Sequence, residues 1–339
     1  MGSLLMLQFK LGQNPLNFVK IGLVTIALPL LLNVLNGCDG TKSNGKKTIA
    51  VTQIVEHPSL NAIRDGIKEE LAQSGFEADK TLNWQWETAQ GSPSTAAQIA
   101  KKFAGDNPDV IVAISTPSAQ SAIAAAPKLP IIFSGVTDPL GAKLISNLQQ
   151  PGGLVTGVSD LAPIAKHLDL IQQISPNIKR LGVLYNAGES NSVSQVNLLK
   201  ASAKGITIVE ATVSNSSEVA TAAKSLVGKV DSIYIPTDNT IVSALEALLQ
   251  VGITNKIPIY AGDIDSVERG AVATLGFNYK DVGKQTGKMI IRVLNGEKPG
   301  TIAVETPKTL NLVVNVKAAK QMGITVPESI LKTAQTVIQ

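Results

Sequence analysis

The feature that most constrains the fold is a strand–loop–helix pattern that occurs in similar form in both halves of the chain. Short runs of β-branched residues alternate with longer runs of helical spacing, which is typical of βαβ units around a parallel sheet. The matching strand segments are 48–54, 109–114 and 130–134 in the first half and 181–185, 231–235 and 258–261 in the second. Each half is too long to be one unit of a solenoid array. The pattern therefore predicts an α/β protein with two similar doubly wound parallel-sheet lobes.

The 339 residues give each lobe enough chain for a core of its own. After the second repeat, a helical run at 282–294 and a strand pattern at 307–315 indicate that the chain revisits the first lobe and then returns. The segment 152–158 lacks the spacing of a phosphate-binding loop, and we interpret it as a crossing between lobes. We expect a first lobe of residues 47–159 plus about 280–305, and a second lobe of 160–279 plus about 306–339.

The N-terminus combines a basic flank, an apolar run and the only cysteine. Lys10 and Lys20 precede the run at 21–35, which is short for a membrane span and ends just before Cys38. This arrangement resembles a bacterial lipoprotein signal peptide. The resemblance implies that residues 1–37 are removed, that Cys38 is lipidated, and that 38–46 tether an extracytoplasmic body to the periplasmic face of the cell membrane. The alternative is an uncleaved signal anchor or transmembrane helix.

The composition excludes several classes of function. One cysteine and two distant histidines, His57 and His167, cannot form a Cys/His zinc site, so we expect no metal and no cofactor. The 30 basic and 26 acidic residues are spread along the chain, which argues against nucleic-acid binding. The chain lacks a G-x-S-x-G nucleophile motif, and no cysteine is left once Cys38 is assigned to a lipid, so we expect no enzyme. The enzymatic alternative is a glycosidase-like pair of Asp138 and Asp263.

Ligands of open parallel sheets bind at the carboxyl ends of the strands, where loops lead into helices. Six loops are therefore expected to meet in one cleft: 56–59, 115–119, 135–138, 185–190, 236–239 and 262–265. The loop at Ser115 begins a helix whose hydroxyls, N–H groups and dipole suit a carboxylate, and Thr137 adds a hydroxyl nearby. The alternative is that these hydroxyls only cap the helix.

The second lobe offers acids at the same cleft. Asp238, next to Asn239, and Asp263 suit an ammonium group, so the two lobes together would fit a zwitterion. Asp238 reads as an ordinary helix N-cap, which makes Asp263 the favoured ammonium partner and Asp265 its competitor. His57 is placed to stack on an aromatic or apolar ligand, unless it is a surface-loop histidine. We interpret His167 as structural.

Six short segments together carry a resemblance to a known family: QIVEHP at 53–58, ISTPSAQ at 114–120, GVTDP at 135–139, PGG at 151–153, TGVSD at 156–160 and PTDNT at 236–240. They resemble the substrate-binding proteins of ABC transporters. The subfamily is the one whose characterised members bind tryptophan and related aromatic amino acids, within the type I periplasmic-binding-protein fold. The resemblance extends from about Lys47 to the end of the chain. It implies two lobes that close on a ligand about a three-segment hinge.

The resemblance also implies residue roles and partners. Thr116, Ser118, Ala119, Val136 and Thr137 would hold the ligand carboxylate, and Asp263, aided by Asp238 and Asn239, would hold the amine. The expected ligand-binding set is completed by His57, Asp138, Asn186 and Glu189. The implied protein is a monomeric solute-binding lipoprotein that delivers a free aromatic or large apolar amino acid to an ABC permease with its ATPase. The alternatives are a sensor that presents its liganded state to a receptor, and a secreted hydrolase on the same scaffold.

Overall fold

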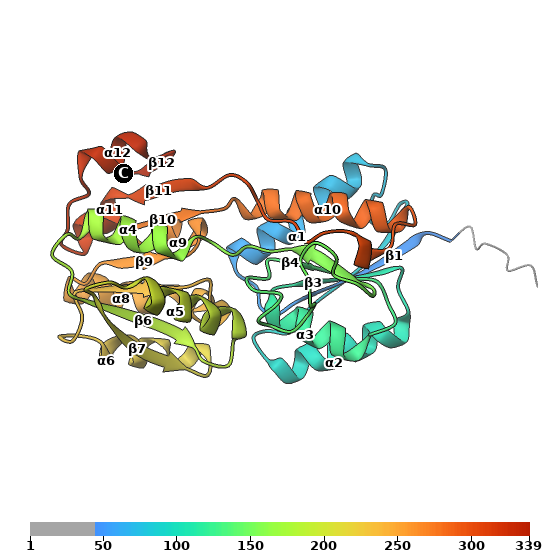
Figure 1. Cartoon of the computed structure of the whole chain (residues 1–339), viewed down its shortest axis with the longest axis horizontal. Coiled ribbons are helices and arrows are strands. Elements are labelled where there is room, and N and C mark those ends of the chain that lie inside the picture. The colour runs from blue at the N-terminus through green and yellow to red at the C-terminus, as the bar shows by residue number, and fades with distance from the viewer. Residues whose placement is uncertain (1–44) are drawn as a thin grey trace, which may run out of the picture. The chain divides into compact units, whose positions relative to one another are not determined.

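The structure is a computed structural model that describes residues 45–339 (Figure 1). The predictions for the signal peptide at 1–37, for Cys38 and for nearly all of the tether lie outside the described residues. Within the described range, no helix combines the length and the apolar character needed to cross a membrane.

The first lobe is built around a five-stranded parallel sheet in the order β2-β1-β3-β4-β5. Its strands are β1 (Lys47–Gln53), β2 (Leu82–Thr88), β3 (Val110–Ile114), β4 (Ile131–Ser134) and β5 (Val155–Val158). Its connecting helices are α1 (Pro58–Gln73), α2 (Pro93–Asp106) and α3 (Thr116–Ala125). Every residue of β3 and β4 is buried. Helices cover both faces of such a sheet, which explains why these strands read as unbroken apolar runs.

The second lobe contains a four-stranded parallel sheet in the order β7-β6-β8-β9 and a three-stranded sheet in the order β10-β11-β12. The backbone N–H of Val272 donates to the carbonyl of Ile259 at 2.7 Å and links the two sheets. The strands are β6 (Arg180–Asn186), β7 (Thr207–Val213), β8 (Ser232–Ile235), β9 (Ile259–Ala261), β10 (Ala273–Gly276), β11 (Asn311–Asn315) and β12 (Thr336–Ile338). The helices are α4 (Ile164–Ile174), α5 (Ser190–Ser202), η1 (Ser216–Glu218), α6 (Val219–Ser225), α7 (Asn239–Ser243), α8 (Leu245–Asn255), α9 (Ile264–Arg269), α11 (Val316–Gln321) and α12 (Glu328–Thr333).

The chain returns to the first lobe late in the sequence. Helix α10 (Tyr279–Leu294), followed by η2 (Pro299–Thr301), lies beside α1 although more than two hundred residues separate them (Figure 1). The chain passes from one apolar core to the other three times: between Ala162 and Ile164, between Ala273 and Phe277, and between Leu310 and Leu312. Two α/β lobes are the architecture that the repeated pattern predicted, and the three crossings match the three-segment hinge that the resemblance implied.

Some local predictions differ from the structure. The segment 152–158 leads into β5 of the first sheet and contains that strand, so the crossing follows it instead of coinciding with it. The strand expected at 307–315 is confined to β11, which runs antiparallel to β10. After the loop at 236–239 the strand–loop–helix pattern predicts one helix, which the structure divides into α7 and α8 at Ala244. The first two differences depend on the strands with which β5 and β11 pair, β4 and β10.

Candidate ligand-binding site

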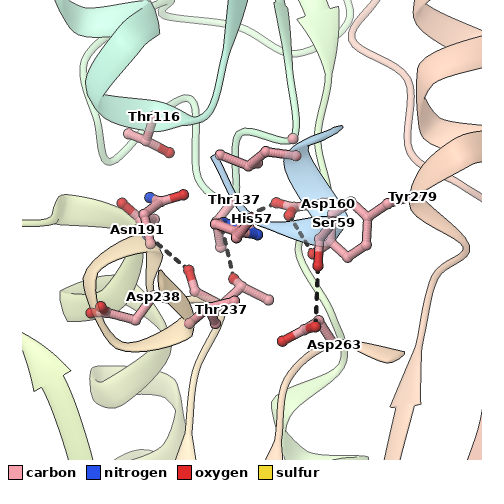
Figure 2. Close-up of a pocket in the computed structure, with 14 residues that line it drawn as sticks. His57, Ser59, Thr116, Thr137, Asp160, Asn191, Thr237, Asp238, Asp263 and Tyr279 are labelled. Carbon is pink, nitrogen blue, oxygen red and sulfur yellow. Dashed lines mark hydrogen bonds between the residues drawn. The ribbon is translucent and has the colours of Figure 1, made fainter. Parts of the chain in front are cut away.

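A small cavity lies where the loops at the carboxyl ends of both parallel sheets face one another (Figure 2). Its volume is ≈ 20 Å³, which is room for a water molecule or two and not for an amino acid. The lining comes from the first lobe, the second lobe and the crossings between them: His57, Ser59, Leu60, Thr116, Gly135, Thr137, Asp160, Asn191, Thr237, Asp238, Asn239, Val242, Asp263 and Tyr279. A ligand of amino-acid size therefore requires this cavity to widen.

The start of helix α3 presents unpaired hydroxyl groups. Thr116 lines the cavity, and Ser118 lies one residue after the proline at the first helical turn. Both side chains are buried, and within the described chain the Thr116 and Ser118 hydroxyls have no hydrogen-bond partner. Neither hydroxyl caps the helix, which contradicts the purely structural alternative. Buried unpaired hydroxyls beside a helix N-terminus are suited to a ligand anion.

Two aspartates of the second lobe line the same cavity, and both cap helices. Asp238 accepts from the backbone N–H of Ile241 at the start of α7, and Asp263 accepts from the backbone N–H of Ser266 at the start of α9. The expected distinction between a capping Asp238 and a non-capping Asp263 is therefore wrong. Burial, together with the nearby Glu189 carboxylate, raises the pKa of Asp238 to about 7. Burial raises the pKa of Asp263 to about 6.

A third carboxylate, Asp160, enters the cavity from the first crossing between the lobes. Its Oδ1 accepts from the Thr137 hydroxyl at 3.0 Å, and its Oδ2 accepts from the Tyr279 hydroxyl at 2.9 Å. Burial raises the pKa of Asp160. Among the described residues that line the cavity there is no lysine or arginine, so the three buried carboxylates have no cationic partner there.

His57 follows β1 and occupies the N-cap position of α1. The ring is buried, which excludes the surface-loop alternative, and burial lowers the pKa of His57 to about 4. A neutral imidazole therefore faces the cavity at physiological pH. His167, in contrast, contacts the Tyr234 hydroxyl and the Leu275 carbonyl inside the second lobe, as the structural interpretation predicted.

Among the described residues, several side-chain contacts join the lobes across the cleft. The Ser59 hydroxyl donates to Asp263 Oδ1 at 3.2 Å, and the Thr137 and Thr237 hydroxyls are 3.5 Å apart (Figure 2). Outside the cavity, Gln120 Nε2 donates to the Ser190 hydroxyl at 3.4 Å and the Ser194 hydroxyl donates to Asp138 Oδ2 at 2.5 Å. The described arrangement is therefore a closed one.

The predicted site residues divide into two groups. His57, Thr116, Thr137, Asp238, Asn239 and Asp263 line the cavity, whereas Ser118, Ala119, Val136, Asp138, Asn186, Glu189 and the competitor Asp265 do not. Ala119 and Val136 lie in the core of the first lobe. Glu189 accepts from the backbone N–H groups of Asn239 and Thr240, and so it anchors the start of α7. Together with Asn186 it lines a separate, wider cleft of ≈ 480 Å³.

Several residues that line the cavity were not predicted as ligand-binding residues, chiefly Asp160, Tyr279, Ser59 and Asn191. Asp160 lies in the segment TGVSD, which carried part of the family resemblance but received no role. Tyr279 follows the second crossing, so only the position of the hinge identifies it. Ser59 lies two residues after His57, at the start of α1 and within the expected loop 56–59. This position was the signal that could have identified Ser59.

Comparison with known proteins identifies relatives over nearly the whole described range. Residues 48–338 match the family of ABC transporter substrate binding proteins. The chain is 40% identical to the tyrosine-binding protein of Clostridioides difficile, over 90% of this chain and 92% of that protein.

Two solved structures show the same fold in different arrangements. A Streptococcus pneumonia ABC domain in complex with L-Trp has 39% identity and a TM-score of 0.84, with 87% of this chain and 100% of that chain covered. The ligand-free, open structure of a Clostridium difficile substrate binding protein with adhesive properties also has 39% identity but a TM-score of 0.64, with 86% and 99% covered. The type I periplasmic-binding-protein fold is thus confirmed. The chain belongs to the family of ABC transporter substrate-binding proteins.

Proposed function

We propose that this protein binds a free aromatic amino acid, tyrosine or tryptophan, in the cavity between its lobes. The observation that carries the proposal is the polarity of the cavity. The unpaired Thr116 hydroxyl lines the cavity at the start of α3, with the buried, unpaired Ser118 hydroxyl two residues further along the helix, while the buried acids Asp238, Asp263 and Asp160 have no cation among the cavity residues. A zwitterion supplies both missing partners, a carboxylate for the hydroxyls and an ammonium group for the acids.

The aromatic side chain is supported by the relatives and by the walls of the cavity. One relative is named for tyrosine, and another was solved with L-Trp. In this chain, Leu60 and Val242 add apolar surface, and the rings of His57 and Tyr279 add faces for stacking. Because the imidazole of His57 is neutral, it can lie against an aromatic ring without burying a charge.

Closure around the ligand follows from the placement of these groups on different lobes. Contacts from α3 and from the loops before α7 and α9 can be made together only when the cleft shuts. The domain boundaries expected from the sequence, 47–159 plus about 280–305 and 160–279 plus about 306–339, are part of this proposal. We further propose that the other expected residues belong to the ligand-binding site. Asn186 and Glu189 would contribute from the wider cleft, and Ser118, Ala119, Val136 and Asp138 from positions next to the cavity.

Transport is the proposed context. We infer that Cys38 carries a lipid after removal of residues 1–37, so that the protein remains at the outer face of the cytoplasmic membrane as a monomer. The liganded form would then deliver the amino acid to an ABC permease with its ATPase. Membership of the substrate-binding family supports the permease as partner.

The ligand is tested by titration calorimetry on purified full-length protein with L-tyrosine, L-tryptophan, L-leucine and glucose. We expect micromolar or tighter binding of the two aromatic amino acids and weaker binding of L-leucine. Binding of glucose alone would overturn the assignment. Mass spectrometry of small molecules released from native protein gives an independent identification.

The lipid anchor is tested by Cys38→Ala and membrane fractionation. We expect the variant to move to the soluble fraction with unchanged ligand affinity, because the anchor lies outside the ligand-binding body. Retention of Cys38→Ala at the membrane with an uncleaved N-terminus would instead support a transmembrane helix.

A further inference from the structure

Asp160 occupies an unusual position for a buried carboxylate. It lies in the first crossing between the lobes, between β5 and α4, and its side chain faces the cavity. Two hydroxyls donate hydrogen bonds to its side chain, those of Thr137 and Tyr279. The hydroxyls line the cavity as well. A carboxylate held in this way still has acceptor positions for a charged donor.

The other two acids of the cavity are held differently. Asp238 accepts from two backbone N–H groups, of Ile241 and Asn186, and from the Ser192 hydroxyl. Both of its oxygens are therefore committed to the fold of the second lobe. Asp263 accepts from the backbone N–H and the hydroxyl of Ser266, and it also accepts the hydroxyl of Ser59 from across the cleft. Asp160, with one hydroxyl donor on each oxygen, is thus the acid with the freest access to a ligand, and Asp263 is the acid that already accepts a donor from the opposite lobe.

Tyr279 interacts with both of these acids, which therefore share one region of the cavity. Its hydroxyl donates to Asp160, and the charges of both Asp160 and Asp263 contribute to raising its pKa well above the usual value, after the larger effect of burial. Figure 2 shows Asp160, Ser59 and Tyr279 grouped together, with Asp263 facing them and Thr116 on the far side. An ammonium group has three N–H donors, so two carboxylates can share it.

We propose that Asp160 is an ammonium-binding residue and that the ligand amine is held between Asp160 in the hinge and Asp263 in the second lobe. This inference rests on the function proposed above. An amine between these residues contacts the first crossing and the second lobe at the same time, and it therefore stabilises the closed arrangement. A ligand that has the ring and the carboxylate but no amine leaves both aspartates without a partner, and it therefore binds more weakly than the amino acid.

The test compares ligands that differ only in the amine. Full-length protein and the variant Asp160→Asn are titrated with L-tryptophan and with indole-3-propionate, which has the same ring and carboxylate but no amine. We expect Asp160→Asn to weaken L-tryptophan binding by at least about 30-fold and to leave indole-3-propionate binding the same or stronger, because the variant removes a carboxylate that this ligand leaves without a partner. Asp263→Asn is expected to show the same selectivity.

The matched control is Asp281→Asn, which removes an exposed carboxylate two residues beyond Tyr279 in α10. We expect this variant to bind both ligands as the unaltered protein does. Equal loss of both ligands in Asp160→Asn would show a structural role and overturn the inference. Unchanged L-tryptophan binding in Asp160→Asn would assign the amine to Asp263 alone. Failure of the unaltered protein to bind either aromatic amino acid would instead refute the proposed function.

A second variant applies if Asp160→Asn fails to fold. Tyr279→Phe keeps the Asp160 carboxylate but removes one of its hydroxyl donors, so the ionised form that binds an amine becomes less favourable. We expect L-tryptophan to bind more weakly by about two- to tenfold while indole-3-propionate is unaffected. A shift of both ligands by the same factor would overturn the inference.

Discussion

The hydroxyl of Ser194 in helix α5 donates a 2.5 Å hydrogen bond to Oδ2 of Asp138, which belongs to the opposite lobe. Asp138 also accepts from the backbone N–H of Gly141 at 2.8 Å, so its side chain is fixed within the first lobe before the lobes meet. The contact lies outside the cavity. It therefore acts as a latch between the lobes that the ligand need not touch.

We expect Ser194→Ala to weaken ligand binding because the variant destabilises the closed arrangement of the lobes. Loss of one hydrogen bond is worth about 0.5–1.5 kcal/mol, or roughly two- to tenfold in affinity. The effect should appear as faster dissociation in stopped-flow fluorescence, with an unchanged unfolding midpoint. The matched control is Ser202→Ala in the same helix, whose hydroxyl donates to the Leu198 carbonyl within its own lobe. An identical effect of both variants would remove the latch from the mechanism.

Ser118→Ala should change affinity and stability in opposite directions. The Ser118 hydroxyl is fully buried and unpaired within the described chain, so its removal should leave the empty protein as stable or up to about 1–3 kcal/mol more stable. If the hydroxyl binds the ligand carboxylate, affinity should fall by about 0.5–3 kcal/mol. Thermal unfolding with and without L-tryptophan measures both quantities.

Ser121→Ala provides the control for this comparison. Ser121 lies one turn further along α3, and its hydroxyl donates to the Pro117 carbonyl at 3.0 Å. It should leave ligand affinity unchanged. Unaltered affinity in Ser118→Ala would place the carboxylate elsewhere.

The raised pKa of Asp263 predicts a pH-dependent effect of Asp263→Asn on the empty protein. Burial raises this pKa from 3.8 to about 6, so between these values the unfolded chain releases its proton before the folded protein does. Asp263 therefore adds nothing below pH 4 and increasingly destabilises the fold as the pH rises to about 6. The advantage of Asp263→Asn in unfolding free energy should grow over this window to roughly 2–3 kcal/mol.

The comparison of variant with unaltered protein isolates Asp263 from other titrating groups. His57, whose pKa is lowered to about 4 by burial, changes stability in the opposite sense between pH 4 and 6.5 but is common to both proteins. Asp281→Asn again serves as the exposed control. A stability difference that does not vary between pH 4 and 7 would contradict the raised pKa.

The pairing of α1 with α10 depends on glycine. A Cβ atom on Gly283 would lie 2.1 Å from the carbonyl oxygen of Ile63, a backbone atom that cannot move aside. We expect Gly283→Ala to destabilise the first lobe by about 1–3 kcal/mol or more, measured as a lower unfolding midpoint. Gly105→Ala in α2, where a Cβ would meet nothing within 4 Å, should be neutral or stabilising by up to about 1 kcal/mol.

Much of the fold was predictable because strands and helices follow local rules. The apolar runs that became β1, β3, β6 and β8 could only be buried strands, and the loops after them could only lie at the carboxyl ends of parallel sheets. That reasoning placed His57, Thr116, Thr137, Asp238 and Asp263 in one cleft, and all five line the cavity.

The roles within the cleft were less predictable, since hydrogen-bond partners come from distant segments. Glu189 was expected among the ligand-binding residues, but in the structure it accepts from Asn239 and Thr240 at the start of α7. Asp263 reads as free of capping, but α9 begins directly after it. A carboxylate near a helix start serves the backbone or a ligand according to which donors reach it.

The sequence by itself determined the two parallel-sheet lobes and the set of loops between them, because the spacing of apolar residues fixes which segments are buried. Only the tertiary structure decided that Asp160 and Tyr279 belong to the cavity. The two residues lie 119 positions apart, Asp160 at the first crossing and Tyr279 at the start of α10 just after the second, and their 2.9 Å hydrogen bond forms only in the folded chain. No local pattern encodes such a meeting, which depends on how the two finished lobes are joined.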